Sequence, residues 1–388
     1  MTITSPYTPE LLSPNRHSDR IAIQTYRKRR TTIVVDTMRE QLEEIYAIRH
    51  PQSILTGFTS SQISAFISEI TQERKGLDSF GVWAWYPWIM TLIHFLPEAM
   101  HTELRTSRNR NLITQKEQEQ FYNAHVGVAG LSVGNSVVAS LVHTGGAKYL
   151  RIADKDIVSG SNTNRIRVGF HMMGVPKYAV MAREVNLVNP YSKISVYKTG
   201  LTKQNIERFL TYPKPLDLVI DEMDNLYLKI QLRVLARKLR IPVIMAADNG
   251  DGVVVDIERY DLHPSLPLMH GQVPESELLA ISPSTPRLEA ARIISRWVTP
   301  QNIADRMKDS LLELGKSLYT WPQLGNAAFM AGSVLSYVAR RILTDAPVRE
   351  GKIVLSPDDL FIPDFSSSAM RAERQRKTDM FKKAIGLS

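Results

Sequence analysis

The sequence predicts an α/β fold in which helices cover both faces of a mostly parallel sheet, preceded by a helical N-terminal region. From residue 125 onward, short apolar runs alternate with segments of helical periodicity, a pattern typical of parallel strands joined by helices. Upstream, residues 35–48 and 59–70 have the apolar spacing of amphipathic helices. The chain has 388 residues, 43% of them hydrophobic, which is enough for one large core or two modest ones.

The expected elements follow one another in a regular order. Strands are expected over residues 125–130, 148–154, 193–198, 216–221, 241–248 and 250–260, the last of them in an antiparallel orientation. Helices are expected over residues 135–143, 177–190, 202–210, 226–239, 287–297, 301–315 and 325–343. The small residues of the last helix favour close helix packing or a dimer face. We therefore divide the chain into a helical region (1–115), a nucleotide-binding domain (116–350) and a C-terminal segment (351–388).

Three N-terminal features need separate interpretation. Residues 1–30 are expected to be irregular, because Pro, Ser and scattered charges interrupt any periodicity. The aromatic stretch 82–96 favours a buried helix that packs on a neighbouring domain or subunit, with a cofactor platform as the alternative. Thr114 followed by Glu117 forms a capping box, which predicts a helix that starts at Thr114.

Composition restricts the classes of protein to which the chain can belong. It contains no cysteine, so disulfides, a zinc ribbon and a catalytic thiol are excluded for these residues. The net charge of +9 suits an anionic ligand, but no nucleic-acid-binding module is visible, so a nucleic-acid partner is not expected. Part of that charge lies in the tail after Ser368, expected to be a solvated helix or a frayed end. The first 20 residues lack the apolar region of a signal peptide, and no run is long enough to span a membrane, so a cytoplasmic location is expected.

A nucleotide site is predicted at the carboxyl edge of the sheet, where ligands of open parallel sheets bind. Gly130 follows the first strand and allows a tight turn, and the helix that begins near Gly134 points free backbone N–H groups at an anion. Asp154 ends the second strand, where an acid accepts hydrogen bonds from a ribose. The glycine fingerprint is incomplete, because Ser132 and Asn135 occupy two of its glycine positions.

Further residues at the same edge favour a triphosphate over a dinucleotide. Arg165 lies in the loop after the second strand, and Lys177 lies in the first turn of the next helix, so both can reach phosphates. Asp221 and Asp224 follow the fourth strand and can supply an acid for Mg²⁺. For each there is a simpler interpretation: Arg165 and Lys177 as solvated loop residues, and Asp224 with Asn225 as the cap of the following helix.

Six motifs in order make residues 126–260 resemble the ThiF/MoeB/ubiquitin-activating superfamily of ATP-dependent adenylating enzymes, and in particular a bacterial ThiF-like branch sometimes fused to nitroreductase-like modules. The motifs are Gly130; Asp154 and Asp156; the Ser161–Arg165 run SNTNR; Gly174 to Lys177; Asn189-Pro190; and the Asp221–Asn225 run DEMDN. The resemblance implies a Rossmann-like ThiF-type domain that adenylates a carboxylate with ATP and releases pyrophosphate.

The resemblance also implies roles for individual residues. Arg165, Lys177, Asp224 and an arginine supplied across a homodimer would be catalytic, and Arg110 is favoured for the last role over Arg108 and Arg105. Asp224 would also hold Mg²⁺. The residues expected to bind the nucleotide are Gly130, Ser132, Gly134, Asp154, Asp156, Asn162 and Asn225. The carboxylate would be a peptide or protein C-terminus, or a small acid.

Departures from the family pattern keep two alternatives open. Side chains at Ser132 and Asn135 stand where glycines normally let the backbone approach phosphate, which is compatible with a non-catalytic scaffold that binds partners. Asp154 would equally serve NAD(P) or FAD in a redox protein, although Arg165, Lys177 and Asp224 would then lack a clear purpose. Without cysteine, an activated acyl group must pass directly to an amine, a thiol or water. His263 and His270 could face that acceptor, or be ordinary loop residues.

Overall fold

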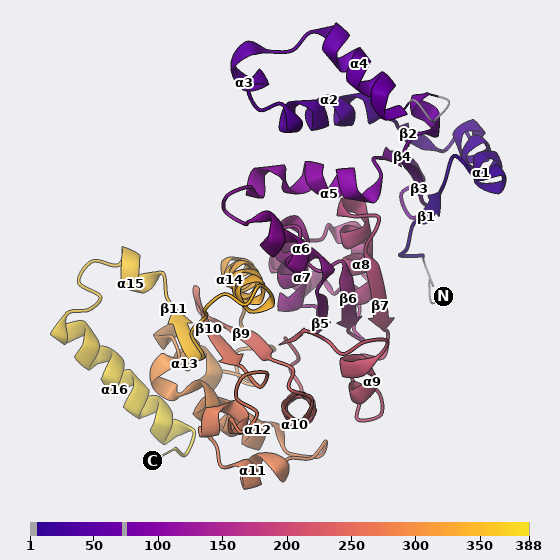
Figure 1. Cartoon of the computed structure of the whole chain (residues 1–388). Coiled ribbons are helices and arrows are strands. Elements are labelled where there is room, and N and C mark those ends of the chain that lie inside the picture. The colour runs from indigo at the N-terminus through magenta and orange to yellow at the C-terminus, as the bar shows by residue number, and fades with distance from the viewer. Residues whose placement is uncertain (1–5, 72–75, 388) are drawn as a thin grey trace. The chain divides into compact units, whose positions relative to one another are not determined.

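A computed structural model describes residues 6–71 and 76–387. The chain divides into two compact units (Figure 1). The first unit comprises the residues up to Glu119 together with 142–145 and 182–192. The second unit comprises residues 120–141, 146–181 and the chain from 193 onward. Each unit is described by itself.

The first unit contains a four-stranded sheet in the order β1-β3-β4-β2. Its strands are β1 (Glu10–Leu12), β2 (Ile33–Val35), β3 (Val82–Tyr86) and β4 (Thr91–Phe95). β3 pairs antiparallel with both β1 and β4, and β2 pairs parallel with β4.

Helices make up most of the rest of the first unit, as predicted. They are α1 (His17–Lys28), α2 (Met38–Arg49), α3 (Ser53–Thr56), α4 (Ser60–Thr71), α5 (Glu98–Thr106) and α6 (Gln115–Asn123), with the 3-10 helices η1 (Leu77–Ser79) and η2 (Ser107–Asn109). The predicted capping box is confirmed, because the Thr114 backbone N–H donates to Glu117 and the Glu117 N–H donates to the Thr114 hydroxyl. The expectation that residues 1–30 are irregular is wrong, since β1 and α1 lie there.

The predicted helix over residues 82–96 is also wrong, because this stretch forms the hairpin of β3 and β4. Aromatic and β-branched residues dominate both halves, and they pack better on a pleated sheet than on a helix. Trp83 is fully buried and stacks on His94 with 4.0 Å between ring centroids. His94 in turn contacts Asp36 and the Phe80 carbonyl oxygen. These aromatic rings are core residues of their unit.

The second unit is built on a seven-stranded sheet in the order β11-β10-β9-β8-β5-β6-β7. The five strands from β5 to β9 pair in parallel, while β10 and β11 are antiparallel additions at one edge. The strands are β5 (His125–Ala129), β6 (Tyr149–Ala153), β7 (Lys193–Tyr197), β8 (Leu218–Asp221), β9 (Val243–Asn249), β10 (Gly252–Glu258) and β11 (Gly351–Leu355). The predicted α/β fold, with helices on both faces of a mostly parallel sheet, is confirmed.

Helices connect and cover these strands (Figure 1). They are α7 (Val133–His143), α8 (Lys177–Val188), α9 (Ile206–Thr211), α10 (Leu226–Leu239), α11 (Glu275–Leu279), α12 (Arg287–Val298), α13 (Asp305–Leu312), α14 (Gly325–Leu343), α15 (Asp358–Phe361) and α16 (Ser368–Ala384), with the 3-10 helices η3 (Gly160–Asn164), η4 (Phe170–Met172), η5 (Leu268–Gly271) and η6 (Pro300–Asn302). The predicted bounds of α10 and α14 agree with the structure, whereas the helix expected over 301–315 is the shorter α13.

Helix α14 packs directly on α7, as its small residues predict. A Cβ atom added at Gly332 would lie 2.6 Å from the backbone of Ser136, so glycine lets the two helices approach closely. The basic tail forms α16, and it is more than a solvated helix. Phe381 and Thr378 are buried, and Thr378 accepts a hydrogen bond from Lys308 of α13 at 2.8 Å.

The order of strands reverses between β5 and β8, and the turns that follow these two strands touch. Gly130 begins the turn after β5 with φ = 90°, a left-handed conformation that favours glycine. A Cβ atom at this position would lie 2.3 Å from the carbonyl oxygen of Glu222, directly after β8. In open α/β sheets the ligand crevice lies at this reversal. Gly130 therefore determines how closely the two halves of the predicted nucleotide site approach each other.

Gly130→Ala should destabilise the chain strongly, because it adds both left-handed strain and a backbone collision. Gly174→Ala is the matched control, since Gly174 also has a positive φ but has no atom within 4 Å of an added Cβ. Chemical denaturation should show a loss of roughly 1–2 kcal/mol for Gly174→Ala and roughly twice that or more for Gly130→Ala. Equal losses in the free energy of unfolding would show that the close contact with Glu222 does not contribute to the effect of Gly130→Ala.

Candidate functional site

The turn after β5 is tied to the loop after β6 by backbone hydrogen bonds. The Gly130 N–H donates to the carbonyl oxygen of Ala153 at 2.8 Å, and the Leu131 N–H donates to Asp154 Oδ2 at 2.7 Å. Helix α7 then begins at Val133, so Gly134 lies in its first turn. The turn thus delivers the N-terminus of α7 to the carboxyl edge of the sheet, as predicted.

Asp154 is a buried carboxylate that links the first two loops. Its second oxygen, Oδ1, accepts the Asp156 N–H at 2.7 Å. Burial raises the pKa of Asp154, although two amide hydrogen bonds and the charge of Lys177 act in the opposite direction. Because both oxygens already accept a backbone amide, a ribose hydroxyl would have to bind through their remaining lone pairs.

The two predicted phosphate-binding cations come from adjacent segments of the second unit. Lys177 is the first residue of α8, is only 8% exposed, and places Nζ 3.3 Å from Asp156 Oδ2. Arg165 follows η3, and its Nε donates to the Ser132 hydroxyl at 3.0 Å. Arg165 therefore contacts the glycine-poor turn. This contact needs the Ser132 hydroxyl, which a glycine at position 132 would not provide.

Arg165 lies close to two acids, one of which the sequence analysis missed. Burial lowers the pKa of the guanidinium, while the charges of Asp248 and Asp224 act against that shift. Asp224 is exposed in the turn after β8. Asp248 lies near the end of β9, at the same edge of the sheet, and burial raises its pKa to about 6. Its place as the last residue of the strand expected over 241–248 was the available signal.

Asn162 and Asn225 both stabilise local backbone. Asn162 Oδ1 accepts the Ser159 N–H at 3.1 Å in the capping box of η3, which leaves its Nδ2 group to donate elsewhere. Asn225 Oδ1 accepts the Leu228 N–H at 3.0 Å, so Asn225 is the N-cap of α10. The simpler interpretation from sequence is thus confirmed for Asn225.

A cleft of about 760 Å³ brings four of the predicted residues together. Asp156, Asn162, Arg165 and Lys177 line it, and residues 320–324 form part of its lining as well. A volume of this size is ordinary for a small-molecule site. The cleft therefore combines the predicted phosphate-binding cations with a segment to which the sequence analysis assigned no function.

Arg110, the predicted arginine from across a homodimer, belongs to the first unit. Its Nη1 donates to the carbonyl oxygen of Ile48 at 3.4 Å, and its Nη2 lies 3.7 Å from Glu103 Oε1. The side chain is 59% exposed. These contacts place Arg110 on the surface of its own unit.

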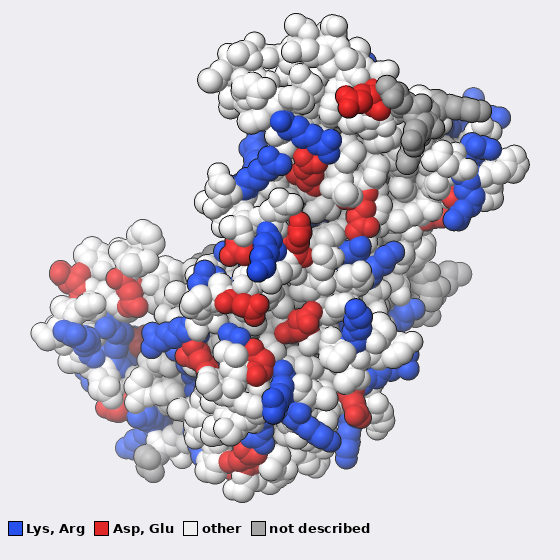
Figure 2. Space-filling view, in the orientation of Figure 1, with Lys and Arg blue, Asp and Glu red and all other residues white. Residues whose placement is uncertain are grey.

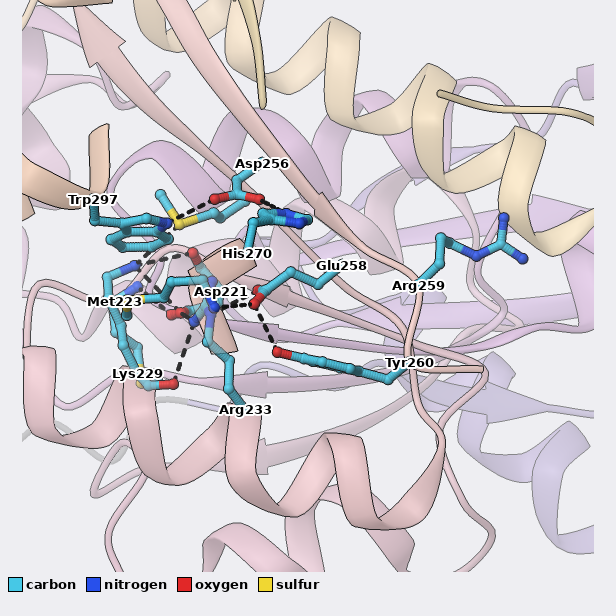
Figure 3. A network of polar contacts seen from close by, with 12 residues as sticks. Asp221, Met223, Lys229, Arg233, Asp256, Glu258, Arg259, Tyr260, His270 and Trp297 are labelled. Carbon is cyan, nitrogen blue, oxygen red and sulfur yellow. Dashed lines mark hydrogen bonds and ion pairs between the residues drawn. The ribbon is translucent and has the colours of Figure 1, made fainter. Parts of the chain in front are cut away.

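Beneath the turn after β8 lies a network of buried charges (Figure 3). Arg233 of α10 is fully buried and pairs with Asp221 Oδ2, while its Nε lies 2.7 Å from Glu258 Oε2 of β10. Lys229, one turn earlier, places Nζ 3.3 Å from Asp221 Oδ2. Burial alone would raise the pKa of Asp221, but Lys229 and Arg233 outweigh it and hold that pKa below its ordinary value.

The network fixes the turn that presents Asp224. Asp221 Oδ1 accepts the Met223 N–H at 3.2 Å, so the buried carboxylate holds the DEMDN segment by its backbone. An ionised carboxylate can be buried here only because cations pair with it. Asp221 is thus a positioning residue for the turn that presents Asp224.

The two histidines weighed from sequence lie outside the residues that line the cleft. His270 Nε2 is 2.7 Å from Asp256 Oδ1, and the Trp297 indole donates to the other oxygen of Asp256 at 2.8 Å (Figure 3). His263 Nε2 is 3.5 Å from Glu350 Oε2. Both contacts match the interpretation as ordinary loop residues.

Three further observations concern the distribution of surface charge, possible metal ligands and possible membrane-spanning helices. On the face shown in Figure 2, Lys and Arg side chains are interspersed with Asp and Glu rather than gathered in one patch. Across residues 6–71 and 76–387, no group of three or more His, Cys, Asp and Glu is placed to hold a metal ion. Within the same residues, no helix combines the length and the apolar character needed to cross a membrane.

The chain contains a ThiF-family domain, since residues 106–283 match the ThiF family. The predicted family resemblance is therefore confirmed. An uncharacterised protein of Mycobacterium tuberculosis (strain CDC 1551 / Oshkosh) is 32% identical over 70% of this chain and 37% of its own length. The tRNA threonylcarbamoyladenosine dehydratase of Bacillus subtilis (strain 168) is 32% identical over 37% of this chain and 57% of its own length. The chain thus spans well under two thirds of these curated relatives.

Among solved structures, the tRNA N6-threonylcarbamoyladenosine dehydratase of Escherichia coli in complex with ATP is similar to this chain. The match has a TM-score of 0.42 and 20% identity, and covers 63% of this chain and 93% of that one.

Arg233→Met should cost roughly 3–5 kcal/mol in the free energy of unfolding, because it leaves Glu258 buried without its cation and leaves Asp221 with Lys229 alone. Arg237→Met is the control on the same helix, since the pair of Arg237 with Glu275 is partly exposed and should contribute roughly 1 kcal/mol or less. Chemical denaturation compares the two variants. Similar losses would mean that the buried network is not held together by Arg233.

The raised pKa of Asp248 predicts a specific pH dependence. Because its folded pKa of about 6 exceeds the ordinary 3.8, folding favours the protonated form, and that stability is lost as pH rises from about 4 to about 6. Asp248→Asn should remove this loss, so the stability of the variant relative to wild type should rise by roughly 1–3 kcal/mol across this window. Denaturation at pH 4, 5, 6 and 7 measures the difference, and a constant difference would contradict the assignment.

Proposed function

We propose that this chain uses ATP to adenylate a carboxylate. The reaction is R–COO⁻ plus ATP giving the acyl adenylate and pyrophosphate. A carboxylate oxygen attacks the α-phosphorus, the bond from that phosphorus to the β-bridging oxygen breaks, and its electron pair leaves with pyrophosphate. The observation that carries the proposal is the cleft that Arg165, Lys177 and Asn162 line together, with Arg165 hydrogen-bonded to Ser132 in the turn after β5, in the region that matches the ThiF family.

In this proposal the cations stabilise charge rather than form covalent bonds. Arg165 and Lys177 neutralise the phosphates, and fixed charges of this kind are the main means of catalysing phosphoryl-group chemistry. The Asn162 amide donates to phosphate oxygens, as do the backbone N–H groups of residues 132–134, where Ser132 holds Arg165 in place. Asp154 accepts from the ribose, with Asp156 beside it.

The same proposal assigns Mg²⁺ to the turn after β8. Its ligands would be Asp224 and phosphate oxygens, and the ion would offset charge on the leaving pyrophosphate. The exposed carboxylate of Asp224 suits a hard cation that keeps most of its water. Asn225, as the N-cap of α10, would keep that carboxylate in place.

The rest of the proposal extends beyond this unit. Arg110 would act on the nucleotide bound by a second copy in a homodimer, and the chain would work in the cytoplasm. The carboxylate would be a peptide or protein C-terminus or a small acid. Because the chain has no cysteine, the acyl group would pass directly to an amine, a thiol or water.

One observation favours the alternative of a non-catalytic scaffold. Arg165 already donates to Ser132, Ser161 and Asn164, so the site satisfies much of its own hydrogen bonding without a ligand. In that case the cleft would bind no nucleotide, and the chain would bind a partner through its N-terminal helices and its aromatic segment 82–96.

Calorimetric titration with ATP, with and without Mg²⁺, tests the proposal. ATP should bind the wild type, and Lys177→Met should weaken binding by roughly 10–100-fold because a charge-assisted contact is lost. Lys203→Met, which removes the same charge from an exposed residue outside the cleft, should bind as the wild type does. Binding of NAD⁺ in place of ATP would favour a redox protein, and binding of neither by folded protein would favour the scaffold.

A further inference from the structure

Two segments of different chemistry contribute to the lining of the cleft. The part here called the cationic wall presents Lys155, Asn162, Arg165 and Lys177. The other is formed by residues 320–324, here called the strap, which includes Trp321, Pro322 and Leu324. Trp321 is 41% exposed and Leu324 is 45% exposed, so both offer apolar surface that this chain itself does not cover.

The strap lies near the start of a long uncharged stretch. From residue 317 to residue 339 the sequence has no Asp, Glu, Lys or Arg. Ile157, 56% exposed, also lines the cleft and adds apolar surface. A ligand that contacts the strap therefore meets indole, pyrrolidine and aliphatic groups beside the neutral side chains of Thr320 and Gln323, and the strap has no cation to pair with a second carboxylate on the ligand.

Hydrogen bonds hold the strap in a defined place beside the cationic wall. Asn164 Nδ2 donates to the Gln323 carbonyl oxygen at 2.7 Å, and Gln323 Nε2 donates to Asp248 Oδ2 at 3.0 Å. Gly325, directly after the strap, lies so close that a Cβ atom would be 2.4 Å from the carbonyl oxygen of Asn164. The strap is thus attached to the same 3-10 helix that positions Asn162 and Arg165.

We propose that the strap is the acyl-group subsite, and that it selects carboxylates whose remaining part is apolar and uncharged. This inference rests on the proposed function. Phosphates require the cationic wall, so the organic part of the carboxylate is left to contact the strap. An apolar group gains free energy in proportion to the area that it buries there, whereas a second carboxylate would lose water and find no cation in the strap to pair with. The uncharged strap thus discriminates against polar acids as well as binding apolar ones.

Acyl-sulfamoyl adenosines, stable mimics of acyl adenylates, test the inference by calorimetry on the full chain. The probes carry acetyl, phenylacetyl or succinyl groups, and AMP is the reference ligand. The phenylacetyl compound should bind at least about tenfold more tightly than the acetyl compound, and the succinyl compound should bind more weakly than either.

Three variants assign the preference to the strap. Trp321→Ala should reduce the affinity for the phenylacetyl compound to that for the acetyl compound, and should leave AMP binding unchanged. Trp321→Lys should reverse the preference, so that the succinyl compound binds more tightly than the phenylacetyl compound. Tyr319→Ala is the control, because Tyr319 is fully exposed beside the strap and does not line the cleft. It should bind all four ligands as the wild type does.

Other outcomes would overturn the inference in distinguishable ways. Equal affinities for the three acyl groups, or a preference for succinyl in the wild type, would show that the strap does not select apolar acids. Loss of AMP binding in Trp321→Ala would assign Trp321 to the adenine base instead. Failure of wild-type protein to bind AMP or any of the three mimics would refute the proposed function itself.

Discussion

The candidate site depends on the burial of Arg233 between two carboxylates. Asp221 ends β8 and Glu258 ends β10, and Arg233 of α10 pairs with both. Two anions could not remain ionised in the interior without such a cation. The pairing joins a parallel strand, an antiparallel strand and a helix, and it holds the turn from which Asp224 projects. Because these charges are buried, substitutions at position 221 should be poorly tolerated. The same pairing holds the turn that carries Asp224 in one conformation.

The edge of the sheet gathers the remaining groups by topology. Because β5, β6, β8 and β9 run parallel, their carboxyl ends deliver Gly130, Asp154, Asp221 and Asp248 to one edge. Short hydrogen bonds then connect neighbouring loops, such as that from the Leu131 N–H to Asp154 and that from Arg165 to Ser132. Ser132 replaces a glycine of the family pattern, and its hydroxyl takes on a role of its own, because it accepts the hydrogen bond that orients Arg165.

Sequence periodicity was sufficient to predict much of the second unit, because its helices have one apolar face and its strands β5, β6, β8, β9 and β10 are mostly buried. The bounds of α10 and α14 could be read directly from these patterns. Residues 82–96 were predicted as a helix because Trp and Tyr dominate the stretch and Pro87 looked like a simple interruption, whereas the proline lies between two strands. Local pattern does not tell a buried hairpin from a buried helix when both are apolar throughout.

Two parts of the site, Asp248 and the strap, were not identified from the sequence, and the reason is physical. Asp248 is a single acid in an ordinary strand, and what distinguishes it is burial and the nearby charge of Arg165, which only the folded chain creates. The strap is an irregular segment, and the hydrogen bond from Asn164 to Gln323 spans 159 residues of sequence. The strap, which joins the site through such distant contacts, carries no local signal, whereas the position of Asp248 at the end of an expected strand was the one signal available for that residue. The motif residues could be predicted because they belong to the turns that follow strands.

A crystal structure of the chain with Mg²⁺ and an ATP analogue, in which a methylene group replaces the oxygen between the α- and β-phosphates, would test the proposed nucleotide site most directly. Density for the triphosphate should lie in the cleft, with the Arg165 guanidinium and Lys177 Nζ within hydrogen-bonding distance of phosphate oxygens and Asp224 beside the metal. The strap should stay in place beside the phosphates. An analogue bound elsewhere on the protein, or a strap that fills the phosphate position and leaves the analogue unbound, would contradict the proposed site.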